Sequence, residues 1–275
     1  MHTEEEDTEL VREPMVEGIF YPADSQQLTS QIGQFFSQSS AVPQISQLIV
    51  SPHGSHDFSG KIMAAAFKSA AASTPKRVVI IAPCFHSRES AVFVPESMIF
   101  RTPLGDSRVD MQMINELLET STLIQKNDLP HLQEHTIEVQ IPFIQYLFPQ
   151  AAIVPILMGS SSEMVLKTLI AGLTICLPAI QPDNLIVVSA NLTGILDQSR
   201  ASRDAEKMID MVTSGNWQGL LDAVDRNEIM DENAGPLALA AWFAQEYEAQ
   251  VVARSNSLSV HYDTTNVVEY AALAL

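Results

Sequence analysis

The stretch LIVSPH at residues 48–53, together with VVIIAP at residues 78–83, decides the fold of this chain. Both are nearly continuous apolar runs, a pattern typical of strands that are buried on both faces of a parallel sheet. Each run leads into a loop that carries a histidine, His53 in the first and His86 in the second. Because ligands bind beyond the carboxyl ends of strands in open α/β sheets, we expect the functional site in these loops.

The rest of the chain alternates apolar runs with segments of helical periodicity. This alternation predicts an α/β fold, a three-layer sandwich with a mostly parallel central sheet. Pro142 should kink or split the helix in which it lies. Helices are expected from Asp24 or Ser25 and at about 60–72, 110–120, 134–147, 163–177, 200–213, 216–226 and 235–248, and strands at 46–52, 77–82, 91–94, 152–158, 185–190, 250–260 and 265–274.

The composition limits the classes of function. The chain has 275 residues, 46% of them hydrophobic, and a net charge of −18. Such an acidic chain lacks the basic surface that non-specific binding to nucleic acid or anionic membranes requires. Residues 1–11 are expected to form a disordered acidic tail, and residues 12–275 a single domain.

The ends and the cysteines indicate a compartment. No signal peptide and no apolar stretch of membrane-spanning length is visible, so no membrane partner is expected. Cys84 and Cys176 are the only cysteines. Two cysteines in a chain of this length, without an export signal, favour reduced thiols and a cytoplasmic location. The chain also lacks the glycine-rich nucleotide fingerprints and the serine-hydrolase elbow.

Several segments together resemble the Memo-like family, the protein B of the AmmeMemoRadiSam system. The matching text is EGIFYPAD at 17–24, SPHG at 51–54, FSG at 58–60, FRTPLG at 100–105, EHTIEVQIPF at 134–143, PILMG at 155–159 and EYAA at 269–272. The resemblance implies the fold of class III extradiol dioxygenases, which hold non-haem Fe(II) with two histidines and one glutamate. It also implies radical-SAM or AMMECR-type proteins as partners.

The family's pocket is built from three histidines and a cysteine, and this sequence departs from that set. His53 matches the first histidine. Phe85 stands at the position of the second, with His86 one residue later, and Gly194 stands at the third. Glu232 replaces the cysteine. The resemblance therefore implies that the family's standard metal site is absent here.

Two interpretations of these residues stay open. His53, His86 and Glu232 could form a two-histidine, one-carboxylate set suited to Fe(II) or Zn(II). Alternatively, His53 is a hydrogen-bonded pocket residue and His86 lies on the surface, because a shift of one residue in extended backbone turns a side chain to the other face.

Other polar residues also admit two interpretations. His56 beside Asp57 could act in acid–base chemistry or merely belong to a polar loop. His135 and Glu138, three residues apart on an expected helix, could bind a metal or form a structural pair. Cys84 is expected to be unreactive, because no cation is adjacent.

We therefore expect a divergent Memo-like protein that needs no cofactor and acts as a small-ligand or protein-binding accessory module rather than an enzyme. The alternative is a dioxygenase-like, metal-dependent oxidoreductase whose site is rebuilt from His53, His86 and Glu232. The expected pocket residues are His53, His56, Phe85, His86, His135, Glu138, Asn191 and Glu232.

Overall fold

An eight-stranded, mostly parallel sheet forms the centre of the molecule. The computed structural model describes residues 9–177, 183–230 and 233–275. The strands lie in the order β10-β11-β2-β9-β3-β8-β4-β7. Their bounds are β10 Gln250–Asn256, β11 Glu269–Ala274, β2 Leu48–Ser51, β9 Asn184–Ser189, β3 Arg77–Pro83, β8 Ala152–Met158, β4 Val92–Val94 and β7 Ile124–Lys126.

The four central strands, β2, β9, β3 and β8, run parallel to one another. Val187 of β9 lies opposite Ile49 of β2 on one side and Ile80 of β3 on the other. All three of these side chains are fully buried, as expected for strands covered on both faces. The β-branched runs in the sequence therefore became the centre of the sheet.

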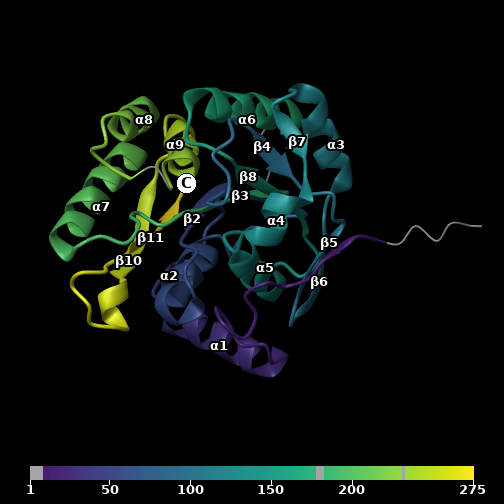
Figure 1. Cartoon of the computed structure of the whole chain (residues 1–275). Helices are drawn as coiled ribbons and strands as arrows, with labels where there is room; N and C mark the ends of the chain where they lie inside the picture. The colour runs from purple at the N-terminus through teal and green to yellow at the C-terminus, as the bar shows by residue number, and fades with distance from the viewer. Residues whose placement is uncertain (1–8, 178–182, 231–232) are drawn as a thin grey trace, which may run out of the picture.

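Helices cover both faces of this sheet (Figure 1). One layer holds α1 Ser25–Gln38, α2 His56–Ser69 and α5 Ile141–Leu147. The other holds α3 Met111–Thr120, α6 Glu163–Cys176, α7 Gln198–Thr213, α8 Trp217–Asp225 and α9 Ala234–Phe243, while the short α4, Asp128–Gln133, lies beside β4. The expected three-layer α/β sandwich is confirmed.

Helix starts follow the capping residues in the sequence. Asp24 accepts a hydrogen bond from the amide of Gln27 and caps α1, as predicted. Asp110 and Ser162 cap α3 and α6 in the same way. None of the helices in the described ranges is long and apolar enough to cross a membrane.

A second, three-stranded sheet was not predicted. It has the order β1-β5-β6, with β1 Val11–Arg12, β5 Ile99–Thr102 and β6 Gly105–Arg108. The carbonyl of Leu10 accepts a hydrogen bond from the amide of Met98 at 2.8 Å. β1 therefore begins at Val11, the last residue of the range 1–11 that the sequence predicted as an acidic tail, and residues 1–8 lie outside the described residues.

The segment 134–147 is not the single helix that its periodicity predicts. Residues 134–135 have no regular structure, residues 136–137 form a turn, the 3₁₀ helix η1 spans Glu138–Gln140, and α5 follows. Pro142 lies in the first turn of α5. Amides in the first turn of a helix have no carbonyl partner within that helix, so the missing N–H of proline costs no hydrogen bond there. The remaining 3₁₀ helix, η2, spans Ser257–Ser259.

Candidate functional site

The candidate residues meet beyond the carboxyl ends of the parallel strands. The loop after β2 carries His53, the loop after β3 carries Phe85, and the loop after β9 carries Asn191. The turn before η1 adds two more residues from the other side. We define the His53 cluster as His53, Phe85, Glu134 and His135.

Backbone and side-chain bonds fix the position of His53, which is 2% exposed. Its amide donates to the side-chain oxygen of Asn191 at 3.1 Å. The amide of Asn191 in turn donates to the side-chain oxygen of Asn233 at 3.2 Å. The two asparagines therefore link the loops after β2 and β9 to the start of α9.

The hydrogen bonds of Ser189 determine which nitrogen of His53 carries the proton. The single hydroxyl proton of Ser189 is donated to the carbonyl of Thr136 at 2.7 Å. The same hydroxyl oxygen accepts a bond from the side-chain Nε2 of Gln140 at 2.9 Å. It lies 3.5 Å from Nδ1 of His53, to which it has no proton left to donate. The tautomer with its proton on Nδ1 is therefore the one that can form a hydrogen bond with Ser189, and this tautomer leaves Nε2 as an acceptor.

Burial keeps the histidines of the cluster neutral. It is the main reason that the pKa of His53 falls to about 3, and the neighbouring His135 makes a smaller contribution in the same direction. Burial likewise lowers the pKa of His135 to about 4. Both rings are consequently uncharged at neutral pH and can act as hydrogen-bond acceptors or bases.

Phe85 packs against both of these imidazole rings. Its ring centroid lies 5.5 Å from that of His53 and 6.0 Å from that of His135. The two imidazoles meet nearly at right angles, with centroids 5.9 Å apart. Phe20, from the N-terminal part of the chain, contacts His135 edge-on, with ring centroids 4.9 Å apart. The cluster is thus a set of rings in mutual contact, with Phe85 37% exposed at its border.

Glu134 contributes a buried carboxyl group beside this cluster. Its side chain is 1% exposed, and Oε2 accepts a hydrogen bond from the amide of Phe85 at 3.0 Å. Among the described residues Oε1 has no hydrogen-bond partner, but it lies 3.4 Å from Nε2 of His86, whose side chain is 56% exposed. Burial raises the pKa of Glu134 to about 7, against the opposing effect of the Phe85 amide.

A cavity of about 550 Å³ adjoins the cluster at Phe85. It lies beyond the carboxyl ends of β3 and β8 and beside the start of α9. Burial raises the pKa of Cys84 to about 11, so its thiol stays protonated, as expected from the sequence. The lining residues are Pro83, Cys84, Phe85, Ser87, Arg88, Met158, Gly159, Ser160, Ser161 and Pro236.

Two expected pocket residues lie elsewhere. His56 is the first residue of α2 and is fully buried, with Nε2 3.0 Å from the carbonyl of Val139. Glu138 is fully buried in an ion pair with Arg12. Because residues 134–137 are not helical, His135 and Glu138 do not share a helix face, and only His135 contacts the cluster.

The donor set does not fit a metal ion within the described residues, where no three or more His, Cys, Asp or Glu side chains form a group able to hold one. Phe85 packs against the imidazoles of both His53 and His135 and supplies no donor atom, and His86 faces Glu134. Glu232 lies outside the described residues. The His53, His86 and Glu232 set therefore remains a prediction.

Sequence reasoning missed three polar residues of this region. Glu134 was seen only as part of a family segment, although a carboxylate directly before His135 is itself a signal. Ser189 and Gln140, which hold His53 through its Nδ1 side, carry weaker signals. A hydroxyl that ends the apolar run of β9 could have identified Ser189, whereas nothing local to Gln140 indicates its contact.

The fold and the site together define a class, the three-layer α/β proteins whose functional residues lie in loops beyond the carboxyl edge of a mostly parallel sheet. Residues 12–274 of the chain match the family described as "Memo-like protein". The chain belongs to this family.

Full-length relatives agree with this assignment. Proteins named "MEMO1 family protein" are 29% identical over 279 residues in Ignicoccus hospitalis, covering 96% of this chain and 98% of the relative. The corresponding protein of Thermotoga maritima is 30% identical over 277 residues, covering 96% and 99%. That of Sulfolobus acidocaldarius is 27% identical over 280 residues, covering 96% and 99%. These names state a family and no activity.

Proposed function

We propose that this Memo-like protein binds a small ligand at the His53 cluster and the adjoining cavity, without a metal ion, as an accessory module rather than an enzyme. The carrying observation is the position of Phe85, which packs against the rings of His53 and His135 where the family resemblance implies a metal ligand. An aromatic ring offers contact surface to an organic ligand and no donor atom to a cation.

The polar groups support the same proposal. The Nδ1-protonated tautomer of His53 leaves Nε2 as a neutral acceptor, and the buried Oε1 of Glu134 has no hydrogen-bond partner in the part of the chain that the structure describes. A ligand hydroxyl or N–H group could donate to either atom. The cavity at Phe85 lies in the size range of small-molecule sites, at about 550 Å³. A hydroxylated ring is therefore a suitable probe.

Ligand-observed NMR with catechol and a set of phenols tests this proposal on the metal-free protein. We expect binding to the wild type and at least tenfold weaker binding to His53→Ala, because about 1.4 kcal/mol is lost with one good hydrogen bond. His261→Ala, an exposed histidine outside the cluster, is the matched control and should bind like the wild type. Absence of binding of every probe to the wild type would overturn the proposal.

A metal-dependent oxidoreductase is the second candidate, and one observation favours it. Histidines that bind metals commonly donate their other ring N–H to a fixed acceptor, as Nδ1 of His53 does to Ser189. His53, His86 and Glu232 would then hold Fe(II) or Zn(II), which would supply open coordination positions for a substrate.

Metal stoichiometry separates the two candidates. Purified wild type, His53→Ala and His261→Ala are each incubated with Fe(II) under anaerobic conditions, and separately with Zn(II), and bound metal is counted after desalting. We expect no stoichiometric binding to any of the three. About one ion per chain in the wild type and in His261→Ala, lost in His53→Ala, would establish the oxidoreductase site and contradict our proposal.

The accessory role extends to protein partners through the family resemblance alone, which implies radical-SAM and AMMECR-type proteins. Such proteins purified from the same source provide the test. Co-elution with the wild type but not with His53→Ala would connect the partner to the cluster. Failure of both to co-elute would remove this part of the proposal.

A further inference from the structure

A buried ion pair joins the N-terminal segment to the segment that carries Glu134 and His135. The guanidinium of Arg12 pairs with the carboxylate of Glu138, 126 residues away, and the two side chains are 1% and 0% exposed. Arg12 ends β1, which pairs in parallel with β5 of the small sheet. The pair therefore joins β1 of the small sheet to η1, which follows the segment that carries Glu134 and His135.

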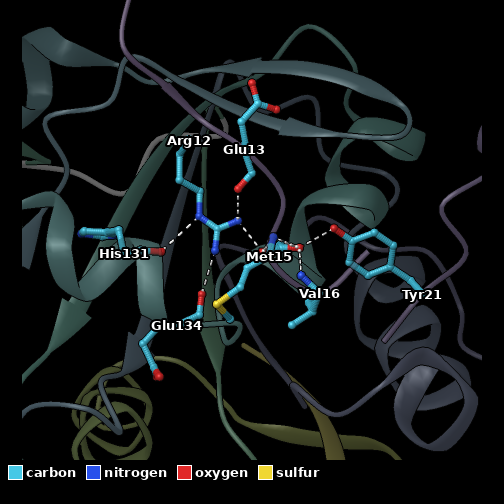
Figure 2. A network of polar contacts seen from close by, with 8 residues as sticks. Arg12, Glu13, Met15, Val16, Tyr21, His131 and Glu134 are labelled. Atoms are coloured by element: carbon cyan, nitrogen blue, oxygen red, sulfur yellow. Dashed lines mark hydrogen bonds and ion pairs between the residues drawn. The ribbon is translucent and has the colours of Figure 1, made fainter. Parts of the chain in front are cut away.

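Arg12 does more than neutralise a carboxylate. Its Nε donates to the carbonyl of His131 at 3.1 Å, and Nη2 donates to the carbonyl of Glu134 at 3.0 Å. Nη1 also contacts the carbonyl of Glu13 at 3.2 Å. Figure 2 shows the planar guanidinium at the centre of these contacts, with its donors spread among them. One side chain thus holds the end of α4 and the turn that follows it.

Glu138 holds the N-terminal segment in return. Its carboxylate accepts hydrogen bonds from the amides of Met15 and Val16, each at 2.9 Å, and from the hydroxyl of Tyr21 at 2.6 Å. We define residues 12–21 as the strap. The carbonyl of Phe20 accepts a hydrogen bond from the amide of His56, and the ring of Phe20 contacts His135. The strap therefore reaches the His53 cluster directly as well as through Arg12.

Glu134 is held from two opposite sides. Arg12 binds its carbonyl oxygen, whereas its carboxyl group points away from Arg12, as Figure 2 shows. That carboxyl group accepts the bond from the amide of Phe85, in the loop after β3. A displacement of the Glu134 backbone would consequently change the bond to Phe85 and the contact of the adjacent His135 with His53.

We propose that Arg12 is a positioning residue of the His53 cluster, which acts through the carbonyl of Glu134 to set the placement of the Glu134 carboxyl group and the His135 ring. Its effect on ligand binding rests on the proposed function, but its effect on geometry does not. The strap is then part of the site although none of its residues lies in the loops beyond the carboxyl ends of the strands.

The choice of arginine supports this role. A buried ion pair contributes little net stability compared with apolar residues of the same volume, so stability alone does not require one here. A guanidinium offers several donors in fixed planar directions, whereas an ammonium is a flexible point charge. Arg12→Lys should therefore keep an attraction to Glu138 while losing the simultaneous bonds to the carbonyls of residues 131 and 134.

Hydrogen exchange at the amide of Phe85 reports the position of the Glu134 carboxyl group. We expect this exchange to accelerate at least tenfold in Arg12→Lys relative to the amide of Ile81 in the centre of β3. The ring resonances of His135 should shift in the same variant. A merely structural role would accelerate both amides equally, because both would then exchange through general destabilisation.

Arg77→Lys is the matched control. Arg77 pairs with Asp110 at 2.6 Å and lies at the amino end of β3, at the edge of the sheet remote from the cluster. This variant also loses a guanidinium in a part-buried ion pair, but we expect it to leave the Phe85-to-Ile81 exchange ratio and the His135 resonances unchanged.

Glu138→Gln is a second variant for the case that Arg12→Lys does not fold. A glutamine oxygen at the Oε1 position still accepts from the amides of Met15 and Val16, but the substitution removes the charge that holds Arg12. We expect the same change in the exchange ratio. A wild-type ratio and unshifted His135 resonances in either folded variant would overturn the proposal. If catechol and the phenols fail to bind the wild type, the proposed function falls while this exchange test still decides the role of Arg12.

Discussion

His53 and Glu134 are both buried, yet burial moves their pKa values in opposite directions. Burial disfavours the charged form of each group, so the pKa of His53 falls to about 3 and that of Glu134 rises to about 7. The imidazole is therefore neutral at physiological pH, whereas the carboxyl group titrates near it. A neutral base and a carboxyl group that titrates near neutral pH thus lie in one cluster.

Glu134→Gln should stabilise the protein at high pH only. The folded-state pKa of Glu134, about 7, lies above its ordinary value of 4.5, so ionisation in the folded state costs free energy above pH 7 and not below pH 4.5. Glutamine avoids this cost and keeps an acceptor for the amide of Phe85. Urea unfolding should show a gain of up to about 3 kcal/mol at pH 8 and none at pH 4.5. An equal change at both pH values would contradict the assigned burial.

Among the elements, β8 ends where another strand approaches its backbone closely. The amide of Gly159, the next residue, donates to the carbonyl of Ala91 at 2.9 Å. A Cβ atom at Gly159 would lie 2.5 Å from the carbonyl oxygen of Glu89 and 3.0 Å from that of Ala91. These are backbone atoms, which cannot move aside as a side-chain end can. The junction between β8 and β4 therefore depends on the absence of a side chain.

Gly159→Ala should lower the free energy of unfolding by about 2–3 kcal/mol, because overpacking against backbone forces the two strands apart. Gly33→Ala is the matched comparison. A Cβ atom there meets only the hydroxyl of Tyr146 at 3.2 Å, the end of an exposed side chain, in the middle of α1. Alanine favours a helix interior by about 0.5–1 kcal/mol, so this variant should be more stable. Equal changes from the two substitutions in urea unfolding would show that the close approach is absent.

At the scale of the whole molecule, a chain of net charge −18 encloses four neutral histidines. His53, His56, His131 and His135 all have pKa values of about 3 to 4, and burial is the principal cause in each. Their ordinary value is 6.5, so the unfolded chain binds protons below that pH and the folded protein does not. Stability supplied by these groups is present above pH 6.5 and declines as the pH falls.

The protein should therefore unfold readily in mild acid. Between pH 7.5 and 5.5 the four histidines should lower the free energy of unfolding by about 5 kcal/mol, offset by about 2 kcal/mol from Glu134. Urea unfolding at a series of pH values measures this slope, and His131→Gln should reduce it by about one proton. A free energy of unfolding that does not change over this range would contradict the burial of these side chains.

The Memo-like architecture was predictable because its signals are local. Apolar β-branched runs such as residues 78–83 identify buried strands, and Asp24, Asp110 and Ser162 mark the starts of helices that the structure confirms. Where the chain must return on itself, the local signal failed. The periodicity of residues 134–147 predicts a helix, but residues 134–137 are not helical. Arg12 donates hydrogen bonds to the carbonyls of His131 and Glu134, at the end of α4 and the start of this non-helical segment.

By itself, the sequence determined the α/β class, the buried strands at the centre of the main sheet, and the positions of His53 and Phe85 in loops that follow two of these strands. Only the tertiary structure decided that His135 joins His53 while Glu138 turns to Arg12, and which nitrogen of His53 carries the proton. The physical reason is that strands and caps depend on neighbours within a few residues. Burial, hydrogen-bond partners and pKa values depend on groups that are brought together from more than a hundred residues apart.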